Sequence, residues 1–401
     1  MNLRAAFLLL AWCSGTSAAV GQSLPSEPVT FGGGRVVIGG DAAASIAPAD
    51  TGFFNYSDYE HSTLRQIRFG ISGSVRANDR LSVLGEVRVD NLRDVTPFAL
   101  YARVRPFPSR RLDIQIGRIP PTFGSFARHA YSNDNPLIGY PLAYQYLTSL
   151  RADSVPRNAD ELLFMRGRGW LSNFSVGNRA PDRGLPLVTA FSWDTGVQVT
   201  TGWRSLDVTG AVTNGSLSNP RVSDDNSGKQ IIGRVTLTPV VGLVLGGSAA
   251  RGQYAERSLI DALPASPDRR FIQRAFGADL EYSRDHWMVR ADTVMSEWRI
   301  PAAGAPVIDR PLRAVAVSVE GRYAFLPGVY AAARGEHLAF NRIVGTARVA
   351  EWDAPVSRVE VGGGYYLQRN VVARMSVQFN HRDGGLVHNL VLPAVQILYW
   401  F

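Results

Sequence analysis

Hydrophobic and polar residues alternate along much of the chain with a period of two. In residues 81–90, valine, leucine and glycine hold the odd positions, while serine, glutamate, arginine and aspartate hold most of the even ones. Residues 315–325 and 371–382 show the same alternation. Because successive side chains of a β-strand point to opposite faces, this pattern predicts strands with one apolar and one polar face. The chain is therefore expected to be all-β.

Turn residues divide the alternating stretches into about sixteen strands, an even number that places both chain ends on one side of the sheet. The predicted strands span residues 36–46, 65–76, 80–90, 96–106, 112–118, 194–203, 205–213, 229–238, 242–252, 270–282, 286–298, 313–325, 328–340, 356–367, 371–381 and 389–401. An extra hairpin in the first region or in residues 119–192 would raise the count to about eighteen.

The connections between the predicted strands alternate in length. Short turns are expected near residues 77–79, 107–111, 204–205, 239–242, 283–286, 326–328 and 368–370. Longer polar segments are expected at residues 47–64, 119–192, 214–228, 255–268, 300–311 and 342–355, whereas the links near 91–95 and 383–387 are brief. Short turns at one end and long loops at the other are typical of outer-membrane β-barrels.

Aromatic residues on the apolar faces gather at two heights. Those near the short turns are Trp203, Tyr282, Trp287, Tyr323, Phe325, Tyr399 and Phe401, and those near the opposite ends are Phe69, Phe98, Phe276 and Phe379. Barrels in membranes carry such aromatic girdles at both lipid–water interfaces. A soluble β-sandwich also alternates, but its core has no reason to sort aromatics by height. A transmembrane antiparallel β-barrel, wide enough at about sixteen strands for an aqueous channel, is therefore favoured.

The amino-terminal segment has the features of an export signal. Arg4 supplies a positive charge, AAFLLLAWC forms a short apolar core, and residues 17–19 are small. We expect residues 1–19 to be a signal peptide and residues 20–401 to form the barrel. Because Cys13 is the single cysteine, a processed chain would have no disulfide framework, thiol nucleophile or cysteine metal site. No later segment reaches the ~18 consecutive apolar residues of a membrane helix.

The carboxyl-terminal strand ends on an aromatic residue. Val395, Ile397, Tyr399 and Phe401 share one face by the period-two rule. We expect the edge of this strand to be closed against the first strand, as in a barrel. The ending also resembles the assembly signal of bacterial outer-membrane barrels, in which Tyr399 and Phe401 would be the recognised residues. The barrel-assembly machinery is therefore an expected partner.

Residues 119–192 form the longest stretch without a predicted barrel strand. Five prolines argue against a regular strand pair there, namely Pro120, Pro121, Pro136, Pro141 and Pro156. A loop of roughly seventy residues is abnormal in a compact protein unless it is functional. We expect it to fold back into the lumen and to act as a constriction loop. An extracellular cap or a peripheral hairpin is the alternative.

The sequence also resembles a known family. The run IGRIPPTFGS at residues 116–125 is similar to the motif before the constriction loop of phosphate- and pyrophosphate-selective porins, and residues 194–252 are similar through DTGVQVTTG, AVTNG and IGRVTLTP. The resemblance implies an anion-handling pore of about sixteen strands that assembles as a homotrimer. That family combines an arginine ladder with a lysine funnel, whereas this chain has the single lysine Lys229 among 42 basic residues. Phosphate selectivity is therefore left open.

Charge is consistent with an anion channel, since the formal net charge is +8. The candidate pore-lining residues are Arg103, Arg105, Arg128, Arg151, Arg157, Arg322, Arg334, Arg358 and Arg374. Parity places nearly as many carboxylates on the inner faces, so most of these charges are expected to form cross-strand ion pairs. Arg103 and Arg105 stand out as same-face arginines near a short turn. Arginines in the loops have a simpler explanation, contact with lipopolysaccharide phosphates.

Together these features predict a channel in the bacterial outer membrane for passive diffusion of small hydrophilic solutes, with a modest preference for anions. Phosphate-like anions are candidate solutes, membrane lipid and lipopolysaccharide are expected partners, and no nucleic-acid signature accompanies the basic charge. One alternative is a surface or adhesion protein built on a barrel with a plugged lumen. An outer-membrane hydrolase is another, although the chain lacks G-x-S-x-G and H-E-x-x-H motifs. No catalytic residue, metal site or cofactor is predicted.

Overall fold

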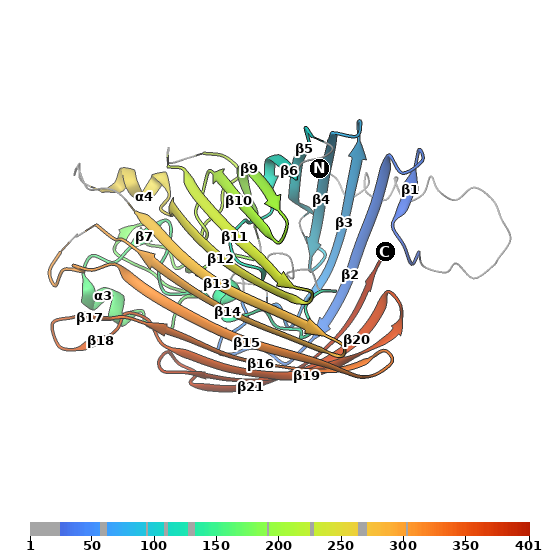
Figure 1. Cartoon of the computed structure of the whole chain (residues 1–401). Helices are drawn as coiled ribbons and strands as arrows, with labels where there is room; N and C mark the ends of the chain where they lie inside the picture. Colours follow the sequence, from blue (N-terminus) through green and yellow to red (C-terminus); the bar gives the residue numbers. More distant parts are fainter. Residues whose placement is uncertain are drawn as a thin grey trace.

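The computed structural model describes residues 25–56, 62–93, 95–107, 111–126, 133–190, 192–224, 228–263, 271–301 and 304–401. Within these residues, sixteen antiparallel strands form one closed barrel (Figure 1). They are β2 (Val36–Ile46), β3 (Ile67–Arg76), β4 (Leu81–Asp90), β5 (Val95–Val104), β6 (Leu112–Ile119), β9 (Asp194–Trp203), β10 (Leu206–Thr213), β11 (Gln230–Val240), β12 (Leu243–Gln253), β13 (Ile272–Arg284), β14 (Trp287–Trp298), β15 (Leu312–Leu326), β16 (Val329–Phe340), β19 (Val356–Gln368), β20 (Val371–Arg382) and β21 (Asn389–Trp400). The predicted fold class is confirmed, and each predicted strand is present with boundaries within two residues.

The barrel closes because β2 pairs with β3 on one edge and with β21 on the other. Just past β21, Phe401 exchanges two backbone hydrogen bonds with Gly40, with N···O distances of 2.9 and 3.0 Å. Beyond that point the short β1 (Val29–Phe31) covers the rest of the same edge by pairing with residues 36–38. Both edges of β2 are therefore paired. This confirms the expectation that the carboxyl-terminal strand closes against the first barrel strand.

Long and short connections lie at opposite ends of the barrel, as expected. Figure 1 shows α4 (Arg257–Ala262), β17 (Arg342–Val344) and β18 (Val349–Glu351) at the long-loop end. The short strands β7 (Ser154–Val155) and β8 (Val176–Gly177) pair only with each other in the described residues. They add no hairpin to the barrel, so its strand count is sixteen rather than eighteen.

The alternating sequence gives the wall an apolar outer face and a polar inner face. In β3, Phe69 and Ile71 point outward and are exposed, whereas Arg68 points inward and is only 5% exposed. In β20, Met375 and Phe379 are outward and Arg374 is inward. Among the described residues, no helix combines the length and the apolar character needed to cross a membrane.

One member of the predicted outer aromatic set lies on the wrong face. The pairing of β4 with β5 shifts register beside Val87, which inserts an extra residue into β5. Phe98 consequently turns inward and is 3% exposed, with its ring 3.4 Å from the Arg88 guanidinium and 4.8 Å from the Trp193 ring. The prediction for Phe98 was wrong because a β-bulge changes side-chain parity, and a regular alternation does not reveal it.

Candidate pore

The long connection between β6 and β9 folds into the barrel. This inner loop, residues 120–193, contains α2 (Leu142–Gln145) and α3 (Ala159–Phe164) besides β7 and β8. Asn158 caps α3 by accepting a hydrogen bond of 3.0 Å from the Glu161 backbone N–H, as expected of a helix that starts after asparagine. Residues 135–152 are buried throughout. The predicted fold class included a long loop folded into the lumen, and the described residues of this segment confirm it.

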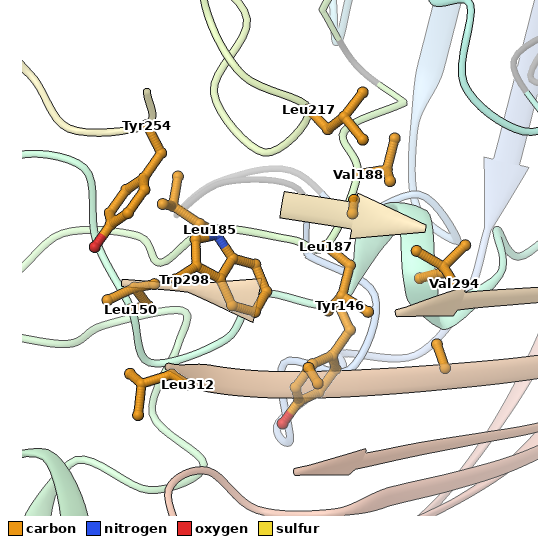
Figure 2. Packing of buried hydrophobic residues seen from close by; sticks show 14 of the residues in the cluster. Tyr146, Leu150, Leu185, Leu187, Val188, Leu217, Tyr254, Val294, Trp298 and Leu312 are labelled. Atoms are coloured by element: carbon orange, nitrogen blue, oxygen red, sulfur yellow. The ribbon is translucent and has the colours of Figure 1, made fainter. Parts of the chain in front are cut away.

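Apolar packing fixes the inner loop against the barrel wall. Figure 2 shows Tyr146, Leu150, Leu185, Leu187 and Val188 of the inner loop beside Leu217, Tyr254, Val294, Trp298 and Leu312. Burying each large side chain of this kind contributes roughly 1.5–3 kcal/mol, so withdrawing the loop would expose several such side chains at once. Burial also raises the pKa of Tyr146 to about 12. The inner loop is therefore a packed part of the core.

A buried network of ion pairs joins the inner loop to one side of the wall. This sealed wall consists of inward-facing side chains of β14, β15, β16 and β19, namely Asp292, Ser318, Glu320, Arg334, Glu336, Arg358 and Glu360. Arg334 contacts the carboxylates of Glu320 and Glu360 at 3.1 and 2.8 Å and donates to the Gly139 carbonyl at 2.7 Å. In return, Glu360 accepts a 3.0 Å hydrogen bond from the Gly139 N–H. Charged side chains of the strands thus pair with one another and with backbone groups of the inner loop, away from open solvent.

Two further contacts extend the seal. The Tyr144 hydroxyl donates to Asp292 at 2.6 Å, and burial raises the pKa of Tyr144 well above its usual value. Asp353, in the connection after β18, accepts from the backbone N–H groups of Ser149 and Gly167 at 2.6 and 2.7 Å. Burial raises the pKa of Asp353 even though these hydrogen bonds act in the opposite direction. The inner loop is therefore held at several points along its length.

The other side of the lumen is open. A cavity of about 680 Å³ lies between the inner loop and the long-loop ends of β3–β6. We call its wall side chains the open wall, namely Arg68, Arg88, Asp90, Thr96 and Arg118. The connections add Arg93, Asp153, Asp182, Arg183 and Glu256 to the lining. By contrast, a cavity of about 30 Å³ separates the inner loop from Ser318 of the sealed wall, which is room for about one water molecule.

The wall arginines of the open side are fixed by hydrogen bonds. Arg68 donates to Asp90 at 3.0 Å and to the Tyr140 hydroxyl of the inner loop at 2.8 Å. Arg88 contacts Glu86 at 2.5 Å and lies over the Phe98 ring. Charge-assisted contacts of this kind are stronger than neutral ones, so these guanidinium groups hold their positions beside the cavity.

Gly117 positions the third wall arginine. Its φ of +131° is one that side chains rarely adopt, and a Cβ there would lie 2.4 Å from the Leu100 carbonyl oxygen. The adjoining Arg118 donates to the carbonyls of Pro97 and Trp193 and to the Ser192 hydroxyl. The Gly-Arg pair in the motif at residues 116–125 therefore ties β6 to the return of the inner loop.

The structure places the described members of the predicted pore arginines in four settings. Arg103 and Arg105 lie at the short-turn end and share Asp113, at 2.5 and 3.0 Å, with side chains 32% and 57% exposed. Arg322 is half-buried, with its guanidinium carbon 4.5 Å from the Tyr330 ring centre. Arg157 is exposed at the start of α3. Arg128 lies outside the described residues.

The remaining four predicted arginines are buried. Arg334 and Arg358 belong to the sealed wall, and Arg358 donates to the Tyr140 and Phe54 carbonyls at 3.2 and 2.8 Å. Arg374 donates to Gln396 across the sheet. Arg151 is enclosed within the inner loop, paired with Asp153 at 2.7 Å. These side chains brace the barrel and the loop instead of reaching the large cavity.

Several residues that line the cavity were not selected from the sequence. Parity did place Arg68 and Arg88 inside, yet nothing in the alternation showed which inward arginines the inner loop would leave uncovered. Arg93, Arg118 and Arg183 lie in or beside connections, where periodicity carries no information. The Gly-Arg step of residues 117–118 was the available signal for Arg118. In the described part of the chain, no three His, Cys, Asp or Glu side chains gather as a metal site would require.

No protein-family model and no curated protein sequence matches the chain. Solved structures do match. OmpF of Salmonella typhi, in complex with daunomycin, is 11% identical over 91% of this chain and 97% of that one, with a TM-score of 0.56. An anion-selective porin from Comamonas acidovorans is 9% identical over 91% and 99%, with a TM-score of 0.55. The trimer form of OmpT, an outer membrane protein of Vibrio cholerae, is 12% identical over 91% and 99%, with a TM-score of 0.52. At these identities the likeness establishes the fold, which is that of outer-membrane porins.

Proposed function

We propose that the protein is a channel of the bacterial outer membrane that passes small hydrophilic solutes by diffusion. The observation that carries this proposal is a closed barrel with an apolar outer face whose lumen keeps a polar cavity of about 680 Å³. An exposed apolar belt of this extent needs lipid around it, and a polar interior suits water-filled passage. The fold shared with porins supports the same proposal.

The inner loop is the proposed constriction. It fills the lumen beside the sealed wall and leaves the open wall as the route for solutes. The pore-lining set then consists of Arg103, Arg105 and Arg322 from the original prediction, joined by Arg93, Arg118 and Arg183. The buried arginines contribute by keeping the inner loop in place.

A modest preference for anions follows from the charges beside the cavity. Five arginines and four carboxylates line it; Asp153 is paired with the buried Arg151 and Arg88 with the buried Glu86, so the lining keeps an excess of one positive charge. At the short-turn end, Arg103 and Arg105 share the single carboxylate of Asp113. Low-dielectric walls focus the field of such an excess into the water-filled route. Phosphate-like anions suit guanidinium groups and are the proposed candidate solutes.

The proposed setting includes export and assembly. Residues 1–19, a proposed signal peptide, lie outside the described residues. Tyr399 and Phe401 at the closing strand are the proposed assembly signal. The trimeric form of OmpT supports a homotrimer as the proposed assembly.

A second candidate function rests on the extent of the sealed wall. If the inner loop closed the open side too, the protein would be a plugged barrel that displays its long loops to a partner. Reconstitution into a planar bilayer distinguishes the two, since a channel gives stepwise conductance and a plugged barrel gives none. A reversal potential in a salt gradient tests anion preference. Replacing Arg103 and Arg105 with Gln should shift it toward cations, most clearly at low salt where screening is weak.

A further inference from the structure

A second large hollow lies on the outside of the barrel. It has a volume of about 590 Å³ and lies where the outer face of β12–β14 meets the connection from β14 to β15. We call it the rim groove. Its lining includes Arg251, Arg274, Arg299, Arg310, Glu297 and Asp309. Four arginines thus face two carboxylates in one groove.

Two of these arginines stand directly opposite each other. Arg251 of β12 is the register partner of Arg274 of β13. Both are exposed, and neither makes a hydrogen bond or ion pair with any residue in the described ranges. Like charges directly opposite on neighbouring strands are destabilising. An anion held between the two guanidinium groups would remove that repulsion.

The nearest carboxylate is already engaged elsewhere. Glu297 is the register partner of both Arg274 and Arg313. Its carboxylate oxygen lies 2.6 Å from one Arg313 nitrogen and 2.7 Å from another. Both Arg313 nitrogens thus donate to the same Glu297 oxygen, and they hold it on the far side from Arg251. The groove therefore keeps its positive charge at the Arg251–Arg274 pair.

The height of the rim groove matches the boundary between lipid tails and headgroups. Arg274 lies two residues before the outward-facing Phe276 on the same strand. Arg274 is therefore about 7 Å nearer to the long-loop end than Phe276. Phe276 belongs to the outer aromatic set, and aromatic residues mark the interface in membrane proteins. Apolar side chains of Ile272, Val307 and Ile308 also line the groove. The arginines and the apolar side chains of the rim groove thus lie at the same height along the barrel.

We infer that the rim groove binds a phosphate group of a membrane lipid, with Arg251 and Arg274 as its two ligands and the apolar side chains against the adjoining lipid. A guanidinium pair can hold phosphate oxygens through several charge-assisted hydrogen bonds. The outward position and the apolar lining favour a lipid over a free anion, because a free anion gains no binding energy from apolar contacts. This inference rests on the proposed membrane location and not on solute passage, so lipid binding and conductance are measured separately.

The test compares purified wild-type protein with the double variant Arg251→Gln and Arg274→Gln in detergent. Binding of lipopolysaccharide is measured by native mass spectrometry and by titration. Loss of two charge-assisted contacts should weaken binding by roughly tenfold to a hundredfold. The control Arg342→Gln changes an exposed arginine of β17 outside the groove and should bind as wild type does. Conductance of the double variant should be unchanged, because the groove faces away from the lumen.

Two further arms separate the possible sources of the phosphate. Dephosphorylated lipopolysaccharide should bind no better to the wild type than to the double variant. Inorganic phosphate at millimolar concentration should not displace the lipid, and displacement would overturn the lipid assignment in favour of a free-anion site. Equal binding of intact lipopolysaccharide to the wild type and the double variant would overturn the site itself.

Discussion

The two sides of the lumen are built from the same residue types and differ in what covers them. On the sealed wall, Arg334 meets Glu320, Glu360 and the inner-loop backbone and is 1% exposed. On the open wall, Arg68 and Arg118 are also held by hydrogen bonds, yet a cavity of about 680 Å³ lies beside them. An arginine ladder along a barrel is therefore not in itself a solute pathway. The path of the inner loop decides which arginines brace the wall and which face water.

The comparison also separates two kinds of energy. Charges on the sealed wall contribute to stability through their partners. Removing one partner leaves the other charge buried and unpaired, which lowers the free energy of unfolding strongly because that charge has lost its hydration. Exposed charges beside the cavity contribute little to stability because water screens them. They act instead on ions that enter the cavity. Mutations on the two sides should accordingly change different measured quantities.

The largest effect is expected from Glu360→Gln on the sealed wall. This change keeps the side-chain shape but removes the charge that Arg334 and the Gly139 N–H contact. It should lower the free energy of unfolding by about 3–5 kcal/mol, measured by urea titration in detergent. The control Asp261→Asn disrupts an exposed 3.5 Å pair with Arg257 and should cost about 0–1 kcal/mol. Equal losses in the two variants would show that the sealed wall is no more stabilising than the surface.

A smaller effect is expected from Gly117→Ala beside the open wall. The strained φ should cost about 1–3 kcal/mol, and the close Leu100 carbonyl should add to it by displacing β6 and Arg118. Thermal unfolding of the folded barrel on denaturing gels measures the loss. The matched control is Gly210→Ala, since no atom lies within 4 Å of a Cβ at that outward position. A Gly117→Ala barrel as stable as the control would mean that the positive φ at this position does not require glycine.

Charge reversal at Arg93 and Arg183 should leave stability nearly unchanged and alter selectivity. Both side chains are exposed and line the cavity, so stability should change by no more than about 0.5 kcal/mol. The reversal potential in a salt gradient should move toward cation preference, and the shift should shrink at high salt. Arg284→Glu, at an exposed short turn, serves as the control. If the control shifted the reversal potential as far, the cavity would not be the route.

The smallest effect concerns pH and the outer contact of α3. The hydroxyl and backbone N–H of Thr346 hydrogen-bond to Asp160 and lower the pKa of that carboxyl. A lowered pKa stabilises the contact above the unfolded value, about 3.9, and the contribution is lost as pH falls through the folded pKa. Hydrogen exchange of the Thr346 amide should therefore speed up below about pH 4 relative to intrinsic exchange. Asp160→Asn should remove this dependence, whereas an unchanged acid response in that variant would place its origin elsewhere.

The barrel wall could be predicted from the sequence because one face of each strand is buried and the other meets a different medium. Apolar and polar residues therefore alternate with a period of two in segments such as 81–90 and 371–382. The same alternation fixes the register in which neighbouring strands pair. The inward orientation of Phe98 was not predicted, because the residue types around it do not reveal a β-bulge. The inner loop could be located as a long segment rich in proline. Its path could not be predicted, since contacts such as Gly139 with Glu360 join residues distant in sequence.

The pore residues were predictable to the same limited extent. Parity placed Arg334, Arg358 and Arg68 on the inner face, and the structure agrees. Whether the inner loop covers an inward-facing arginine depends on the path of that loop. The residues next to Arg334 in the sequence give no information about this path. Arg183 lies on the inner loop itself, so its place beside the cavity follows only from the folded path.

Thiol labelling during single-channel recording tests the central claim most directly, that solutes pass along the open wall and not along the sealed wall. Cys13 is the single cysteine of the sequence, so a cysteine introduced at Thr96 or Ser318 in a Cys13→Ala background is a unique target. Thr96 lines the cavity of about 680 Å³, and Ser318 lines the one of about 30 Å³. A bulky charged thiol reagent should reduce the conductance of Thr96→Cys stepwise and leave Ser318→Cys unchanged. Block of Ser318→Cys with no effect on Thr96→Cys would contradict the account.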